Sequence, residues 1–230
     1  MNELALFAGA GGGILASNLL GHNVVCAVER DEYCQSVLVQ RQNDGCLNTF
    51  PIWDDICTFD GKPWRGTVDL VSGGFPCQAF STAARGRNIA EKDLWGEMFR
   101  VVREVCPTLV FAENVSEKPI RKAKEDLESL GYKVVYTKLS AKDVGADHIR
   151  TRYWLLAHSD HYGELCCTVN AEAQGLPELC NSFWQSYPVE HGVVDGVAHK
   201  LERNRAVGNG QVPLVAAVAF TKLIDTLMNT

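Results

Sequence analysis

The chain has 230 residues, of which 46% are hydrophobic and 22% are charged, and this ordinary composition excludes disordered, collagen-like and coiled-coil proteins. The apolar stretch over residues 212–228 contains Lys222 and Asp225, so no segment reaches the ~18 uninterrupted apolar residues of a membrane span. The first residues lack the basic region of a signal peptide, and we expect an intracellular protein that does not contact a membrane. Nine cysteines without a Cys-x-x-Cys pair favour reduced thiols, and we expect no metal site.

The net charge of −6 conceals a basic middle third. Residues 61–158 contain 16 Lys and Arg against 12 Asp and Glu, whereas residues 1–60 contain 2 against 8 and residues 159–230 contain 4 against 8. Because affinity for a polyanion depends on the local potential rather than on the total charge, a nucleic-acid partner is compatible with this distribution. The alternative is that the charges around residues 121–128 only form the solvated face of a helix.

Short apolar runs alternate with longer amphipathic segments through the first 158 residues. The first run, residues 4–7, ends in a glycine-rich turn over residues 8–13, which opens a helix to Leu20. A second run, residues 24–28, ends at Glu29, and Asp31 is placed to cap a helix through Gln40. Further strands are predicted over residues 68–72, 108–112, 133–139 and 152–157, and a last helix over residues 211–228. This alternation predicts an α/β fold with a mostly parallel sheet.

Four side chains that could take part in a reaction each follow an apolar run. They are those of Glu29, Asp55, Cys77 and Glu113. In parallel α/β sheets ligands bind beyond the carboxyl ends of the strands, so these residues predict one site. Cys77 comes directly after Pro76 on a Gly-Gly loop, a setting that presents a thiol as a nucleophile. Glu113 is available there as an acid or as a hydrogen-bond donor to a ring nitrogen. The glycine-rich turn together with Glu29 indicates a cofactor of the adenosine type.

Five segments resemble, in order and spacing, the motifs of the DNA cytosine-5 methyltransferases. They are residues 6–12 (Leu-Phe-Ala-Gly-Ala-Gly-Gly), 74–78 (Gly-Phe-Pro-Cys-Gln), 113–115 (Glu-Asn-Val), 150–152 (Arg-Thr-Arg) and 208–210 (Gly-Asn-Gly). The chain is most similar to small phage-type members with a reduced target-recognition region. The resemblance implies a Rossmann-like fold dependent on S-adenosylmethionine. It also implies a catalytic and cofactor-binding domain over residues 1–158, a small irregular recognition lobe over residues 159–203, and a segment with a helix over residues 204–230 that returns to the catalytic domain.

The resemblance also assigns roles to individual residues. The Cys77 thiolate would add to C6 of a flipped cytosine, Glu113 would engage N3 and the exocyclic amine, and Arg152 with Arg150 beside it would hold O2. The positions matching the S-adenosylmethionine site of the family are Phe7, Gly9, Gly11, Glu29, Asp55, Ile56, Phe75, Leu94 and Asn209. Because base flipping requires a mobile loop after the nucleophile, we expect residues 80–91, with Ser81, Arg85 and Arg87, to contact DNA.

The expected partner is double-stranded DNA, bound by a monomer, with restriction–modification as one of several biological roles. The region available to read the target, some forty residues, is short, so recognition is either relaxed or supplied by a partner chain. This region is either an ordered small lobe or a partly mobile loop. Two alternatives stay open: an RNA cytosine-5 methyltransferase of the same architecture, and a catalytically idle regulatory relative that binds DNA. The intact set of Cys77, Glu113 and Arg152 argues against the idle relative. The expected location is the cytoplasm of a bacterial or phage-infected cell.

Overall fold

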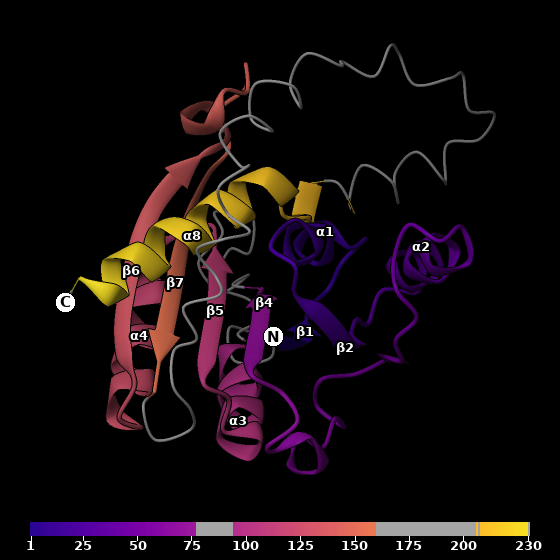
Figure 1. The fold of residues 1–230 in the computed structure, drawn as a ribbon, viewed down its shortest axis with the longest axis horizontal. Helices are drawn as coiled ribbons and strands as arrows, with labels where there is room; N and C mark the ends of the chain where they lie inside the picture. The colour runs from indigo at the N-terminus through magenta and orange to yellow at the C-terminus, as the bar shows by residue number, and fades with distance from the viewer. Residues whose placement is uncertain (77–93, 160–205, 207, 230) are drawn as a thin grey trace, which may run out of the picture.

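A seven-stranded sheet with the strand order β3-β2-β1-β4-β5-β7-β6 forms the centre of the molecule (Figure 1). The computed structural model describes residues 1–76, 94–159, 206 and 208–229. The strands are β1 (Asn2–Leu6), β2 (Asn23–Val28), β3 (Ile52–Trp53), β4 (Leu70–Gly74), β5 (Leu109–Asn114), β6 (Lys133–Ser140) and β7 (Thr151–His158). The helices are α1 (Gly12–Leu19), α2 (Glu32–Asn43), α3 (Trp95–Val105), α4 (Glu117–Ser129) and α8 (Pro213–Met228), with the short 3-10 turns η1 (Lys62–Trp64) and η4 (Ala141–Val144).

Strands β1 to β5 pair in parallel, whereas β7 is antiparallel to both of its neighbours, β5 and β6. The predicted mostly parallel sheet is therefore confirmed. The exception follows from chain length, because only residues 141–150 join β6 to β7. A parallel connection needs a dozen or more residues, so the chain reverses instead.

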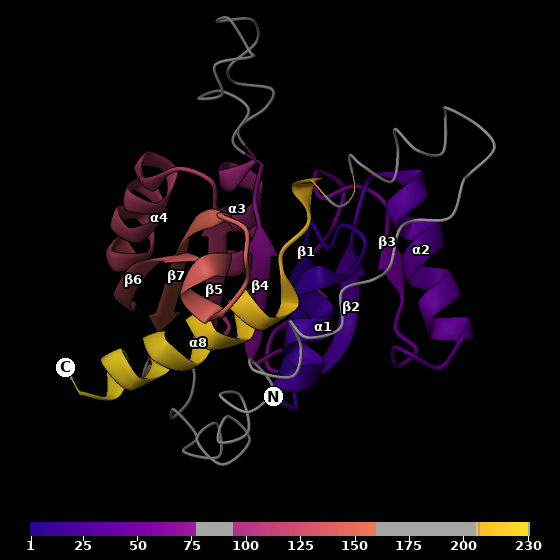
Figure 2. The same ribbon diagram turned by 90° about the horizontal axis from the view of Figure 1, so that it is seen from above.

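Helices cover both faces of the sheet (Figure 2). On β5, Val110 and Ala112 belong to the core under α3 and α4, whereas Leu109 and Phe111 belong to the core under α1 and α8. This alternation is the period of two that a strand buried on both faces requires. Helix α2 packs over the β2 end of the sheet through Leu38. None of the helices in the described residues is long and apolar enough to cross a membrane.

The element boundaries differ from the predicted ones in ways that have local causes. Helix α8 begins at Pro213 rather than at residue 211, because proline favours the first helical position, where no backbone N–H is needed. The Asp31 side chain caps α2 as predicted by accepting a hydrogen bond from the Cys34 backbone N–H. The two-residue strand β3 was not predicted, since so short a segment has no periodicity.

Candidate active site

The carboxyl ends of five neighbouring strands bring together the side chains that the sequence singled out. In the order of the sheet, Asp55 follows β3, Glu29 follows β2, Phe7 follows β1, Phe75 follows β4 and Glu113 lies near the end of β5. These residues are up to 106 positions apart in the sequence, from Phe7 to Glu113. Of the four residues predicted to share one site, Glu29, Asp55 and Glu113 lie at this edge of the sheet, and Cys77 lies outside the described residues.

The turn after β1 has an unusual backbone. Phe7 and Gly9 have φ angles of 53° and 54°, and Gly11 has a φ of 92°. A Cβ atom placed on Gly9 would meet no atom within 4 Å, so this part of the turn borders open space. The Gly9 backbone N–H donates to Glu29 Oε2 at 2.6 Å, and the Asp31 N–H donates to Oε1 at 2.7 Å. The Glu29 carboxylate thus holds the turn in place and retains oxygen lone pairs for further donors.

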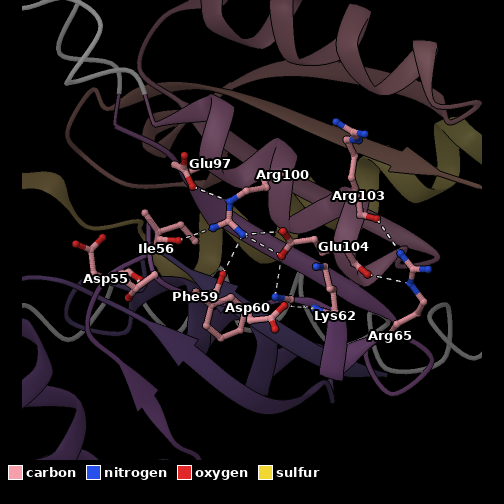
Figure 3. A network of polar contacts seen from close by, with 12 residues as sticks. Asp55, Ile56, Phe59, Asp60, Lys62, Arg65, Glu97, Arg100, Arg103 and Glu104 are labelled. Carbon is pink, nitrogen blue, oxygen red and sulfur yellow. Dashed lines mark hydrogen bonds and ion pairs between the residues drawn. The ribbon is translucent and has the colours of Figure 1, made fainter.

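A network of polar contacts holds the turn that contains Asp55 and Ile56 against α3 (Figure 3). Arg100 on α3 donates to the carbonyl oxygens of Ile56 at 2.7 Å and of Phe59 at 2.9 Å. The same guanidinium pairs with Glu97 at 2.8 Å and with Glu104 at 2.9 Å. At the tip of the turn the Cys57 backbone N–H donates to Asp55, and this bond lowers the pKa of the Asp55 carboxyl group.

Asn114, next to Glu113, ties two strand ends together. Its side-chain amide donates to the Phe75 carbonyl oxygen at 2.9 Å, and its Oδ1 accepts from the Ser116 backbone N–H at 3.1 Å. The Phe75 ring is buried and packs on Trp95, with 5.1 Å between the ring centroids. The chain is therefore fixed at Phe75, two residues before the predicted nucleophile.

The Glu113 carboxyl group is buried beside a cation. Arg152 Nε lies 3.0 Å from Oε1, and both side chains are largely shielded from solvent. Burial raises the pKa of Glu113 to about 6, while Arg152, Arg150 and a hydrogen bond from Gln211 act in the opposite direction. Although Arg152 is an ion-pair partner, Oε1 accepts no hydrogen bond from the described part of the chain. A buried oxygen with unused acceptor capacity is suited to a ligand.

Arg150 has a different partner from Arg152. Its guanidinium Nη2 donates to the carbonyl oxygens of Gly208 at 2.8 Å and Gly210 at 2.6 Å. Burial and the neighbouring Arg152 lower the pKa of Arg150. The exposed Asn209 lies between the two bonded carbonyls. These contacts hold the C-terminal segment beside the site, and the expected role of Arg150 at the substrate stays a prediction.

The remaining predicted positions divide into two groups. Leu94 precedes α3, and its carbonyl oxygen accepts from the Met98 N–H at 3.1 Å. The predictions for Cys77, Ser81, Arg85, Arg87 and the recognition lobe lie outside the described residues. The sequence interpretation missed Arg100 and Gln211. Nothing in the sequence marked Arg100, whereas the position of Gln211 one residue after Gly-Asn-Gly was a signal that went unused.

The comparison with known proteins agrees with the arrangement of these residues. The profile of the family described as C-5 cytosine-specific DNA methylase matches residues 1–206. The chain belongs to this family. Among its members, the chain is similar to the Type II methyltransferase M.PspPI of Psychrobacter sp. (strain TA137), with 37% identity over 56% of this chain and 32% of the relative. It is also similar to the Type II methyltransferase M1.HphI of Haemophilus parahaemolyticus, with 30% identity over 91% of this chain and 62% of the relative.

Solved structures support the methylase fold. A proposed DNA modification methyltransferase encoded within an E. coli prophage has a TM-score of 0.55 and 28% identity, over 70% of this chain and 47% of the other. The S. pombe Dnmt2 methyltransferase has a TM-score of 0.54 over 84% of this chain and 58% of the other, and at 22% identity it shows the fold alone. The methylase chain described here therefore spans from about one third to less than two thirds of the length of these relatives.

Proposed function

We propose that this chain transfers a methyl group from S-adenosylmethionine to C5 of cytosine in double-stranded DNA. The observation that carries the proposal is the buried Glu113 carboxyl group, whose pKa is about 6, paired with Arg152 at the carboxyl end of the sheet. A carboxyl group that protonates near neutral pH is able to donate a hydrogen bond to a ring nitrogen. Membership in the cytosine-5 methylase family supplies the reaction class.

In the proposed reaction, the Cys77 thiolate forms a bond from its sulfur to C6 of a flipped cytosine, and the electron pair of the C5–C6 double bond moves toward C5. Glu113 donates a proton to N3 and stabilises the resulting enamine, while Arg152 holds O2. S-adenosylmethionine, when bound, supplies an electrophilic methyl group to C5. Loss of the C5 proton to a base then restores the double bond and expels the Cys77 thiolate, and N3 returns its proton to Glu113.

The turn after β1 and the carboxyl ends of β2 and β3 have the shape and the acidic groups that binding of the cofactor requires. The open space beside Gly9 lets the backbone approach a ligand closely. Glu29 lies at the carboxyl end of β2, where an acidic side chain takes the hydroxyls of a ribose. The other proposed cofactor positions are Phe7, Gly11, Asp55, Ile56, Phe75, Leu94 and Asn209. Of these, Phe75 and Ile56 have buried side chains, so we expect them to contribute backbone atoms or a wall of the site.

We further propose that residues 159–203 read the target and that residues 204–230 return the chain to the catalytic domain. Support for the second assignment comes from the bonds of Arg150 to Gly208 and Gly210 and from the packing of α8 on the sheet. A lobe of this size holds two or three base contacts of about 1–3 kcal/mol each, so we expect a target of about two to four base pairs. The proposed activity places the protein with the DNA in the cytoplasm of a bacterial or phage-infected cell. A monomer or a complex with a recognition chain is compatible with it.

The decisive experiment supplies the purified chain with radiolabelled S-adenosylmethionine and either plasmid DNA or RNA. We expect label in cytosine of DNA and none in RNA; label confined to RNA would replace the proposal with an RNA methyltransferase. DNA containing 5-fluorocytosine should trap a covalent adduct, because fluorine blocks the final elimination. Cys77→Ala should abolish both methyl transfer and the adduct, whereas Cys46→Ala, at an exposed thiol, should leave both unchanged.

A further inference from the structure

Gln211 occupies the junction between the C-terminal segment and the ends of the central strands. It lies two residues before the first residue of α8, Pro213, and is partly buried. The residues just before it are held by Arg150 through the Gly208 and Gly210 carbonyls. The backbone at Gln211 is thus held from one side by Arg150, the residue before β7, and from the other side by α8.

Three glycines make room for this one glutamine. A Cβ atom on Gly12 would overlap the Gln211 carbonyl oxygen, and one on Gly13 would lie 2.6 Å from Gln211 Oε1. A Cβ atom on Gly74 would lie 3.1 Å from Gln211 Nε2. None of the three has a positive φ, unlike Gly9 and Gly11 in the first turn. Backbone conformation therefore does not demand glycine at these three positions, whereas the space taken by the Gln211 backbone at Gly12, by its side chain at Gly13, and by Glu113 and Gln211 together at Gly74 does.

The Gln211 side chain also contacts the buried acid. The same Cβ atom on Gly74 would lie 2.7 Å from Glu113 Oε2, so this oxygen and Gln211 Nε2 share one small space. The Gln211 amide also acts on Glu113 electrostatically, because it is among the groups that lower the pKa of this carboxyl group. Oε1 accepts no hydrogen bond from the described part of the chain, which leaves Oε2, the oxygen beside Nε2, to face the amide. The amide N–H of Gln211 donates to it, since a carboxylate only accepts.

We infer that Gln211 is a positioning residue, which is seated by Gly12, Gly13 and Gly74 and which fixes the Glu113 carboxyl group by taking its Oε2 oxygen. The Oε1 oxygen then remains for the substrate. The charged groups of the described residues that face Glu113 are Arg152 and Arg150, both contributed by β7 and the residue before it. The neutral amide therefore orients the carboxyl group without adding a third charge. The catalytic consequence rests on the proposed function, whereas the geometry does not.

The first test measures the protonation of Glu113 directly. The protein is labelled with 13C at the glutamate side-chain carboxyls, Glu113→Gln identifies the signal, and a pH titration gives the pKa. Gln211→Met keeps the length of the side chain but removes the donor, so the pKa of Glu113 should rise by about one unit. Gln211→Glu places a second carboxyl group there and should raise it further. Gln40→Met removes an exposed glutamine that bonds Asp44 and should change nothing at Glu113.

The second test measures, through the melting temperature, whether Gly13 contacts the Gln211 side chain. Gly13→Ala should lower the melting temperature by several degrees, because the new methyl group meets Gln211 Oε1. In a Gln211→Ala background the same change should be neutral or stabilising, because alanine is the better helix former. Such coupling identifies direct contact. Gly96→Ala, where a Cβ atom meets no atom within 4 Å, should have the same effect in both backgrounds.

Methylation rates as a function of pH complete the test. A protonated Glu113 is the donor in the proposed reaction, so activity falls as the pH rises past its pKa. In Gln211→Met the pH at which activity falls should therefore be higher than in the wild type, with the KM for S-adenosylmethionine unchanged. An unchanged pKa of Glu113 in Gln211→Met and Gln211→Glu would overturn the inference. A wild-type chain that methylates nothing, but whose Glu113 pKa responds as expected, would refute the proposed function and leave the positioning role intact.

Discussion

Replacing Arg100 with methionine removes a guanidinium and keeps most of the aliphatic side chain. The wild-type group donates to the Ile56 and Phe59 carbonyl oxygens at 2.7 and 2.9 Å, and hydrogen bonds from a charged donor contribute about 1.5–3 kcal/mol each. The Arg100 side chain is 32% exposed, so water replaces part of what is lost. We therefore expect the free energy of unfolding to fall by about 1.5–3 kcal/mol, about half of the summed contribution of the two bonds.

For a chain of this size such a loss lowers the melting temperature by roughly 5–10 °C. Because Arg100 holds the turn of Asp55 and Ile56, we also expect affinity for S-adenosylmethionine to fall about tenfold, or about 1.4 kcal/mol. Thermal denaturation and titration calorimetry measure the two effects. Arg103→Met is the matched control, because Arg103 lies on the same helix with an exposed side chain. Equal melting temperatures for the two variants would refute the reasoning.

Three further predictions concern the cofactor, pH and salt. Glu29→Ala should weaken S-adenosylmethionine binding about tenfold or more in calorimetry, whereas Glu32→Ala, at an exposed position nearby, should not. The Glu113 pKa of about 6 lies above its ordinary value of 4.5. The folded state therefore holds the proton more tightly, and stability is lost as the pH rises between these values. Relative to Glu113→Gln, the wild type should lose about 2 kcal/mol between pH 4 and pH 7 in denaturant titrations, and parallel curves for the two proteins would contradict the burial argument. DNA methylation should decline steeply with added salt, because the basic residues within 61–158 neutralise phosphates. A methylation rate that does not change with salt would show that these residues do not contact the DNA.

The elements that sequence periodicity predicted are those buried on one or two faces of the sheet. Strand β5 was found because the run over residues 109–112 is apolar on both faces, and Glu113 was found because it follows that run. The orientation of β7 depends on the length of the connection from β6 and on its position between β5 and β6, which periodicity does not encode. The role of Arg100 at the turn escaped prediction because the partners that define it are backbone carbonyls 41 and 44 residues away. Gln211 escaped because its neighbours are glycines, whose significance appears only when the chain is folded.

The contact between Phe75 and Trp95, with ring centroids 5.1 Å apart, has a consequence for how this chain tolerates change. The two residues bracket the segment that begins with Cys77, and Trp95 is anchored again through its indole N–H to Asp126 at 2.7 Å. Phe75 and Trp95, on either side of this segment, thus lie next to each other in the fold. Loop-closure entropy grows only slowly with length, by about 0.6 kcal/mol for each doubling. Where that principle applies, a change of length between these two anchored aromatic residues should cost the described scaffold little, which thermal denaturation of an insertion series would measure.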